Sequence, residues 1–235
     1  MNPLTLNFIR QALNLPLPSE NGDAEVKRIV TDSRDIRSSD VFFALAGERF
    51  DAHDFAADVL AKGAAAVVVS REDCAALPGA LKVGDTLAAL QTLAAAWRNE
   101  TNPFVFGITG SSGKTTVKEM LAGILRHRFG EDAVLATAGN FNNHIGLPLT
   151  LLKLTPAHRY AVIEMGMNHF GELAALTRIA RPDVALVNNA LRAHVGCGFD
   201  GVGDIAKAKS EIYQGLSENG LALVPAEDAH AAVFQ

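Results

Sequence analysis

A glycine-rich segment in the middle of the chain constrains the fold more than any other feature of the sequence. Residues 107–116 read Gly-Ile-Thr-Gly-Ser-Ser-Gly-Lys-Thr-Thr. They follow an apolar strand predicted over 104–108 and lead into a helix predicted over 115–128. Glycines at such a junction let backbone N–H groups turn inward around oxyanions, as in the phosphate loops of parallel α/β folds. The alternative, a glycine-rich turn without function, requires Gly-Lys-Thr-Thr to occur there by accident.

This loop is a variant of the usual phosphate-loop pattern. The strict pattern G-x-x-x-x-G-K-[ST] places its first glycine at Ile108, whereas the early glycine here is Gly110. Lys114 supplies a point charge for the outer phosphates, and the hydroxyl of Thr115 is suited to Mg²⁺. The following helix is predicted to be amphipathic, with an apolar face made of Val117, Met120, Leu121 and Ile124.

Strands and helices alternate regularly along the second half of the chain. Strands are predicted at 104–108, 133–136, 160–164, 183–188 and 221–224, and helices at 115–128, 147–153, 170–180 and 204–217. This alternation predicts a doubly wound, mostly parallel sheet that binds ligands at the carboxyl ends of its strands.

A smaller α/β region precedes this pattern. Short β-rich runs are predicted at 26–30, 41–45 and 65–69. Two helices are predicted at 54–62 and 85–97, with Asp85 as the N-cap of the second. Because the polar residues 99–103 break the pattern, we predict a substrate-binding domain over residues 1–100 and an incomplete ATP-binding domain over residues 101–235.

Composition limits the possible partners and the compartment. The net charge of −5 comes from interspersed acidic and basic residues, so no basic stripe indicates nucleic-acid binding. Residues 1–10 lack the order of a signal peptide, and no apolar run reaches the length of a membrane span. We therefore expect a cytoplasmic protein without membrane insertion. Cys74 and Cys197 are interpreted as reduced thiols and are assigned no role.

Three further side chains are candidates for chemistry. Glu164 ends an apolar strand, where a carboxylate would meet Mg²⁺ held by phosphates. His194 lies in the loop after the next strand, and Lys209 lies on the apolar stripe of a predicted helix, whereas Lys207 points away. Each has a plain alternative: a surface glutamate, a solvated loop histidine, and a lysine whose stem packs while its amine reaches water.

Several segments together resemble the Mur ligase family. Residues 109–120 resemble the family's ATP loop, including its variant glycine spacing. The other matching segments are 31–34, 40–45 and 47–53 for the N-terminal uridine-nucleotide domain, 140–148 for the substrate loop of the central domain, and 164–168 for the Mg²⁺ carboxylate segment.

The resemblance implies an ATP-dependent, amide-forming ligase that uses Mg²⁺ and proceeds through an acyl phosphate. Its implied substrates are UDP-N-acetylmuramoyl-tripeptide and D-alanyl-D-alanine, and we expect a monomer. The implied catalytic residues are Lys114, Glu164, His194 and Lys209; ATP ligands are Gly110, Ser111, Ser112, Gly113, Lys114, Thr115 and Thr116; substrate ligands are Ser33, Arg34, Gly47, His53, Asn140, Asn142 and Asn143; metal ligands are Thr115, Glu164 and His194. Lys209 also matches a lysine that several family members carbamylate.

Alternatives of other classes remain. Family members continue beyond the position that corresponds to Gln235, so we expect these residues alone to bind nucleotides without ligating. A switch GTPase is disfavoured because no Asn-Lys-x-Asp segment occurs. A sister ligase that adds a single amino acid is the nearest enzymatic alternative. Ser111-Ser112 and residues 142–148 resemble the dipeptide-adding member more closely.

Overall fold

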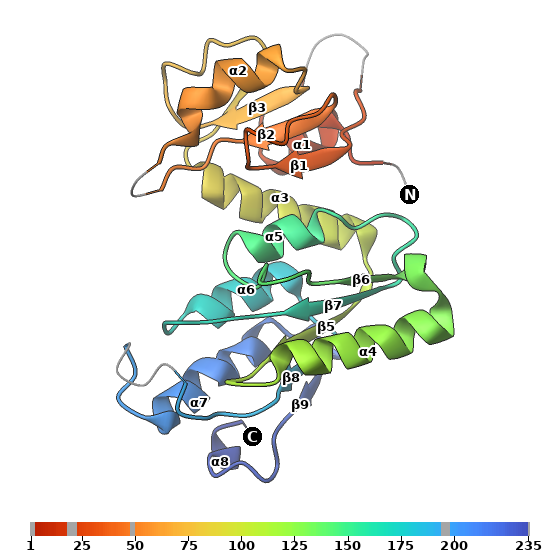
Figure 1. The fold of residues 1–235 in the computed structure, drawn as a ribbon, viewed down its shortest axis with the longest axis vertical. Helices are drawn as coiled ribbons and strands as arrows, with labels where there is room; N and C mark the ends of the chain where they lie inside the picture. The colour runs from red at the N-terminus through yellow and green to blue at the C-terminus, as the bar shows by residue number, and fades with distance from the viewer. Residues whose placement is uncertain (1–2, 18–22, 48–49, 194–197, 235) are drawn as a thin grey trace. The chain divides into compact units, whose positions relative to one another are not determined.

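Two parallel β-sheets form the framework of the chain, one in each of two structural units, Met1–Trp97 and Arg98–Gln235 (Figure 1). The computed structural model describes residues 3–17, 23–47, 50–193 and 198–234. Helix α3, Thr86–Thr101, crosses the division between the units. The side chain of Asp85 accepts hydrogen bonds from Leu87 N and Ala88 N and so caps this helix, as predicted.

The first unit contains a four-stranded sheet whose strands pair in sequence order, β1-β2-β3-β4. The strands are β1 (Arg28–Val30), β2 (Asp40–Phe43), β3 (Ala66–Val69) and β4 (Ala80–Lys82), and the helical segments are α1 (Leu6–Ala12), the 3-10 turn η1 (Ala52–Phe55) and α2 (Ala56–Ala61). Phe42, Val67 and Val59 belong to its core, so α2 packs on β2 and β3. Because all strands run the same way, the segments after β1, β2 and β3 share one edge of the sheet.

The second unit contains a five-stranded parallel sheet in the order β6-β7-β5-β8-β9. Its strands are β5 (Phe104–Thr109), β6 (Val134–Ala136), β7 (Tyr160–Glu164), β8 (Val184–Val187) and β9 (Leu221–Leu223). Its helical segments are α4 (Lys114–Phe129), η2 (Glu131–Ala133), α5 (Gly146–Leu151), α6 (Glu172–Ala180), α7 (Val202–Ser210), η3 (Glu211–Gly215) and α8 (Ala231–Phe234). The glycine-rich loop therefore leaves the central strand of the sheet.

Helices α4 and α6 cover opposite faces of this sheet. Ile108 of β5 and Val162 of β7 share a core cluster with Leu125 of α4. Gly107 faces the other side, because successive residues of a strand alternate between faces. A Cβ there would lie 3.3 Å from Pro182, which directly follows the α6 region. The doubly wound α/β fold predicted from the alternation is thus confirmed.

The helix predicted over residues 204–217 is two segments. The chain tightens from α7 into η3 at Glu211. Thr177 Oγ1 of α6 donates to Ile212 O at 2.6 Å, and a Cβ on Gly215 would lie 2.4 Å from Thr177 C. This close approach of η3 to α6 needs a backbone path that a regular α-helix would not follow. The sequence also failed to indicate α1, β4 and α8.

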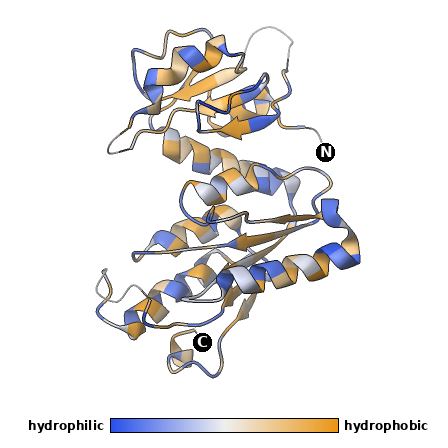
Figure 2. Cartoon of the chain, in the orientation of Figure 1, coloured by the Kyte–Doolittle hydropathy of each residue, from blue (hydrophilic) through white to orange (hydrophobic). Residues whose placement is uncertain are grey.

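The predicted apolar face of α4 was partly wrong. Val117 and Leu121 pack against the core, but Met120 and Ile124 are each 64% exposed. Lys118 is buried in their place and donates from Nζ to Thr137 O at 2.6 Å. Figure 2 shows the result, strands that are mostly hydrophobic and an α4 with hydrophobic patches on its exposed surface. Among the described residues, no helix has the length and apolar character to cross a membrane.

Candidate functional site

The loop between β5 and α4 leaves the first N–H groups of the helix open. Gly113 precedes α4 in left-handed backbone with φ of 74°. A Cβ at this position would lie 2.9 Å from Asn188 Nδ2, so both conformation and space require glycine. Within the part of the chain that the structure describes, the N–H groups of residues 113–116 have no protein acceptor. They form an anion-binding helix terminus, reinforced by the helix dipole.

The preceding two residues of the loop are tied to the segment after β8. Asn189 Oδ1 accepts hydrogen bonds of 3.1 Å from both Ser111 N and Ser112 N. Asn188 Nδ2 donates to Ser112 O at 2.9 Å, and Asn189 Nδ2 donates to the same oxygen at 3.2 Å. The hydroxyl of Ser111 accepts from Leu191 N at 2.9 Å. The loop is therefore held by protein groups on one side and open on the other.

Two lysines bring positive charge to the site from different elements. Lys114, at the start of α4, donates from Nζ to Gly110 O at 2.8 Å, so its amine folds back over the loop. Lys209 of α7 is only 2% exposed, as its place on the apolar stripe indicates. Burial, and secondarily the charge of Lys114, lowers the pKa of Lys209 to about 8.

Glu164 ends β7 beside the first turn of α4. Its side chain is buried and accepts from Thr115 Oγ1 and from Asn142 Nδ2, each at 2.8 Å. Its own N–H donates to Thr137 Oγ1 at 2.9 Å. The carboxylate thus joins α4 to the 140–146 loop, and the backbone N–H of Glu164 adds a bond to Thr137, which follows β6. The alternative of a chance surface glutamate is excluded by this burial.

Lys118 and Thr137 form a second layer of contacts behind Glu164. Lys118 lies one turn after Lys114, yet it is 1% exposed and pairs with Glu119 at 2.7 Å. Its bond to Thr137 O fixes the residue whose hydroxyl holds the Glu164 backbone. Because each buried polar group has a partner, this layer is able to hold the carboxylate in place at little cost.

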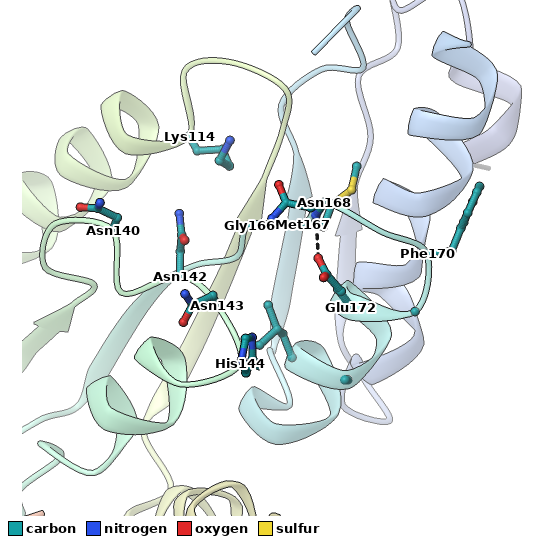
Figure 3. A pocket seen from close by; sticks show the side chains of 13 residues that line it. Lys114, Asn140, Asn142, Asn143, His144, Gly166, Met167, Asn168, Phe170 and Glu172 are labelled. Carbon is teal, nitrogen blue, oxygen red and sulfur yellow. Dashed lines mark hydrogen bonds between the residues drawn. The ribbon is translucent and has the colours of Figure 1, made fainter. Parts of the chain in front are cut away.

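A cavity of about 710 Å³ opens next to Lys114 (Figure 3). Two segments line most of it, the 140–144 loop and the loop from Gly166 into the first turn of α6. Figure 3 shows Asn142 and Asn143 on the side opposite Asn168. Its lining residues are Lys114, Asn140, Asn142, Asn143, His144, Gly166, Met167, Asn168, Phe170, Gly171, Glu172, Ala175 and Leu176. The volume and polar lining suit a small-molecule substrate.

The 140–146 loop is packed closely enough to have one shape. Asn143 Oδ1 accepts from Ile145 N at 3.1 Å and from Gly146 N at 2.8 Å, which starts α5. A Cβ on Gly146 would lie 2.4 Å from Phe141 Cα, so no other residue fits. Of the three asparagines predicted to bind substrate, Asn140, Asn142 and Asn143 all line the cavity, although Asn142 is also bonded to Glu164.

The predicted substrate residues of the first unit share the carboxyl edge of its sheet but differ in exposure. Arg34 is exposed and pairs with Asp32 at 2.6 Å, which lowers the pKa of Asp32. Ser33 O accepts from Lys62 Nζ, and Gly47 N donates to Phe50 O. His53 is instead buried: Nδ1 lies 2.6 Å from Asp51 Oδ1, and Nε2 accepts from Ser70 N at 2.8 Å.

These bonds determine the tautomer of His53. Because Nε2 accepts an N–H, the ring proton is on Nδ1, facing Asp51. Both ring nitrogens are occupied by the protein. His53 therefore supports the 51–55 turn.

Two predicted features fall outside this geometry. His194 and Cys197 lie outside the described residues. In the ranges that are described, no group of three or more histidine, cysteine or acidic side chains is arranged to hold a metal. Cys74 is a buried free thiol whose pKa is raised by burial.

Four contacting residues were not indicated by the sequence: Asn188, Asn189, Lys118 and Thr137. A signal existed for two of them, since Asn188-Asn189 directly follows an apolar strand and so belongs to the ligand edge of the sheet. Nothing local distinguishes Lys118 or Thr137. Their roles depend on α4 packing over the end of β6.

Comparison with known families and proteins gives consistent matches. Residues 108–235 match the model described as Mur ligase middle domain, and residues 25–101 match that described as Mur ligase family, catalytic domain. The chain is 47% identical to the UDP-N-acetylmuramoyl-tripeptide–D-alanyl-D-alanine ligase of Escherichia coli over 228 residues. This match covers 97% of the chain and 49% of the Escherichia coli protein. The ligase of the same name from Haemophilus influenzae is 47% identical over 91% of the chain and 47% of its own length. The chain thus spans about half the length of these relatives.

Solved structures resemble the whole chain. A crystal structure of MurF from Acinetobacter baumannii matches with a TM-score of 0.87 at 41% identity. The match covers 100% of this chain and 51% of the Acinetobacter baumannii chain. MurF ligase from Thermotoga maritima in complex with ADP has a TM-score of 0.73 at 35% identity, covering 84% of this chain and 45% of its own.

Proposed function

This chain belongs to the Mur ligase family, and from that premise we propose that it carries the nucleotide-binding parts of a ligase joining D-alanyl-D-alanine to UDP-N-acetylmuramoyl-tripeptide. The proposal is supported by relatives of that name at up to 47% identity. One structural observation carries it: Thr115, in the first turn after the phosphate loop, contacts Glu164 at the end of a neighbouring strand. A nucleotide-dependent enzyme needs hydroxyl and carboxylate together at that position.

The proposed reaction has two steps. A terminal carboxylate oxygen of the tripeptide attacks the γ-phosphorus of ATP, and the bond from that phosphorus to the bridging oxygen of ADP breaks. The amine of D-alanyl-D-alanine then attacks the carbonyl carbon of the acyl phosphate; an amide forms, phosphate leaves and the amine loses a proton to water. This chemistry requires a cytoplasmic supply of ATP.

The chain's own groups address the charge in the first step. The attacking carboxylate and the triphosphate repel each other, so positive charge and N–H donors must be present beforehand. The N–H groups of residues 113–116, which have no protein acceptor among the described residues, are proposed to donate to the phosphates. Lys114, whose Nζ donates to Gly110 O in this structure, is proposed to add a positive charge beside them. Most of the work is positioning, because phosphoryl transfer needs little covalent chemistry from the protein.

The residues present fit Mg²⁺ in part. Thr115 Oγ1 and a Glu164 carboxylate oxygen, 2.8 Å apart, are the hard oxygen donors that Mg²⁺ prefers. When bound, Mg²⁺ would offset negative charge on the phosphate oxygens. With two side chains from the described residues, the remaining ligands would be phosphate oxygens and water. The family resemblance implies that His194 would help to bind a second Mg²⁺. Lys209 matches a lysine that several family members carbamylate, and as a carbamate it would add an anionic group to the site. Its pKa is lowered mainly by burial and then by the charge of Lys114, which favours the neutral amine that carbamylation needs.

The first substrate is proposed to bind through its uridine nucleotide at the carboxyl edge of the first sheet. Ser33, Arg34 and Gly47 are the candidates, with His53 supporting the turn beside them. Within the second unit, Asn140, Asn142 and Asn143 are proposed as substrate-binding residues of the 710 Å³ cavity that they line.

Calorimetric titration of this chain tests the proposal. UDP-N-acetylmuramoyl-tripeptide and ATP with Mg²⁺ are titrated separately, with uridine monophosphate as the comparison for the first. Saturable binding of both is expected, with Lys114→Ala weakening ATP alone and Arg34→Ala weakening the UDP substrate alone. If either variant stays folded but no longer binds either ligand, the assignment of two separate sites would be contradicted.

A ligation assay completes the test. We propose that the 235 residues alone bind but do not ligate, since their relatives are about twice as long. Product from D-alanyl-D-alanine would refute this restriction while supporting the activity. Product from single amino acids in place of the dipeptide would favour the sister ligase.

A further inference from the structure

The phosphate loop divides into two halves with different hydrogen-bonding states. The N–H groups of Ser111 and Ser112 both donate to one side-chain oxygen, Asn189 Oδ1, at 3.1 Å. Ser111 N also donates to the backbone oxygen of Asn189 at 3.1 Å, so only Ser112 N depends on the side chain alone. In the described residues, the next four N–H groups, of residues 113–116, have no protein acceptor. A single oxygen that accepts from two successive backbone N–H groups is the arrangement that a bound phosphate oxygen would provide.

The amide groups of the asparagine pair also bond to the carbonyl side of the loop. Asn188 Nδ2 and Asn189 Nδ2 both donate to Ser112 O, at 2.9 and 3.2 Å. Asn189 therefore accepts from the loop with one end of its amide and donates with the other. An unliganded glycine-rich loop would otherwise have these backbone groups unsatisfied and many conformations available.

Packing of Asn188 explains where the glycines stand. A Cβ on Gly110 would lie 3.0 Å from Asn188 Cβ, and one on Gly113 would lie 2.9 Å from Asn188 Nδ2. The loop is thus shaped around this side chain. This contact accounts for a glycine at 110, whereas position 108 holds the buried core residue Ile108.

We propose that Asn188 and Asn189 are positioning residues that hold the phosphate loop in its nucleotide-receptive shape before nucleotide arrives, and that phosphate recognition falls to the N–H groups of residues 113–116. The inference rests on the proposed binding of nucleotide at this loop. It adds two points: which residues order the empty loop, and which of its N–H groups remain free for phosphate.

The competing arrangement is displacement. If phosphate oxygens instead bind Ser111 N and Ser112 N, then Asn189 occupies these groups only in the empty loop and competes with nucleotide. Removing the Asn189 side chain would then tighten nucleotide binding. Under the positioning role, removal loosens the loop and lowers the fraction of chains ready to bind, which weakens the apparent affinity.

The test compares Asn189→Ala, Asn188→Ala and Asn189→Asp with the control Asn99→Ala, whose side chain accepts a bond from Arg181 on the surface of the same unit. Amide exchange of Ser111 and Ser112 is measured by NMR without ligand, and binding of ADP and ATP with Mg²⁺ is measured by calorimetry. In Asn189→Ala, Ser112 N loses its acceptor, whereas Ser111 N keeps Asn189 O and Ser112 O keeps Asn188 Nδ2. Exchange at Ser112 is therefore expected to rise about tenfold and ADP affinity to fall about tenfold, as the net loss of one modest hydrogen bond predicts.

The aspartate variant separates shape from charge. It keeps an acceptor for Ser111 N and Ser112 N, so their exchange stays slow, but it places a negative charge beside the phosphates. ATP affinity is therefore expected to fall more than ADP affinity, and salt should reduce the difference. In the unmodified chain, ADP should slow exchange at residues 115 and 116 and leave residues 111 and 112 unchanged.

Unchanged or tighter ADP binding by Asn189→Ala would overturn the inference. So would unchanged exchange at Ser112 in that variant, since Ser112 N has only the side chain of Asn189 as its acceptor. Failure of the unmodified chain to bind any nucleotide would be a failure of the proposed function, and the ligand-free exchange would still decide whether the asparagines order the loop.

Discussion

The hydroxyl of Thr115 donates a 2.8 Å hydrogen bond to the carboxylate of Glu164. These residues are 49 positions apart in sequence, and they meet because β5 and β7 are parallel neighbours with Ile108 paired to Glu164. The carboxyl end of β7 therefore lies beside the start of α4. The contact links the phosphate loop to the Asn142 side of the cavity through one buried side chain.

Replacing Glu164 by glutamine tests its role in metal-dependent binding. The variant retains the shape and an oxygen for Thr115, but it removes the negative charge that Mg²⁺ requires. Mg²⁺ raises the affinity for ADP by some factor in the unmodified chain, and we expect this factor to be about ten times smaller in the variant. A loss of this size is typical of one charged ligand contact. Calorimetry with and without Mg²⁺ measures this. Glu218→Gln, at an exposed position, is the matched control. Equal Mg²⁺ effects in both variants would remove Glu164 from the metal site.

The sequence predicted those site residues whose role follows from strand order. Lys114 follows the short loop after one apolar strand and Glu164 ends another, and the carboxyl ends of parallel strands share one edge. Their proximity therefore follows from the order of strands and helices along the chain. Lys209 was likewise found from helical spacing, because its neighbours on the stripe, such as Ile205, are buried.

The rest of the site depends on contacts that have no periodic signature. Lys118 reads as an exposed helix residue, yet the packing of α4 against β6 buries it on Thr137 O. His53 was predicted as a substrate ligand from the family resemblance of residues 47–53, yet Asp51 and Ser70 form hydrogen bonds with both of its ring nitrogens. In both cases the deciding partner is remote in sequence or lies on another element.

Two glycine substitutions are expected to have opposite effects on stability. Gly146→Ala places a Cβ 2.4 Å from Phe141 Cα, so the backbone must move and we expect a loss of roughly 2–4 kcal/mol. Gly123→Ala lies in the exposed middle of α4 with nothing within 4 Å, and it should gain about 0.5–1 kcal/mol. Denaturant unfolding of the two variants measures both changes. A stable Gly146→Ala variant would show that the 140–146 loop is free to rearrange.

Arg34 and His53, predicted together as substrate residues, should separate experimentally. Arg34 is exposed, with only a surface partner in Asp32, so Arg34→Ala should weaken binding of the UDP substrate without a measurable change in unfolding. His53→Ala leaves Ser70 N without its buried acceptor and should lower stability by about 1–3 kcal/mol. Thermal unfolding and calorimetry on the same samples make the comparison. The assignment fails if Arg34→Ala binds the substrate as the unmodified chain does.

Lys209 makes stability depend on pH in a defined direction. Its pKa is lowered in the fold from 10.5 to about 8, mainly by burial and then by the charge of Lys114. Between these values the unfolded chain binds the proton and the folded chain does not, so the stability of the fold rises with pH in that window. Below about pH 8 both states are protonated, and the full cost of burying the charge, roughly 3 kcal/mol, is present.

Lys209→Met removes this charge while keeping an unbranched apolar side chain. At pH 7 we expect the free energy of unfolding of the variant to be roughly 1–3 kcal/mol higher than that of the unmodified chain. The buffer is freed of carbon dioxide so that the lysine amine stays unmodified. The gain should shrink steadily from pH 8 to pH 10. Lys207→Met, exposed on the same helix, is the control and should show neither effect. A gain that is equal at pH 7 and pH 10 would mean that the burial of charge at Lys209 does not limit the stability of this fold.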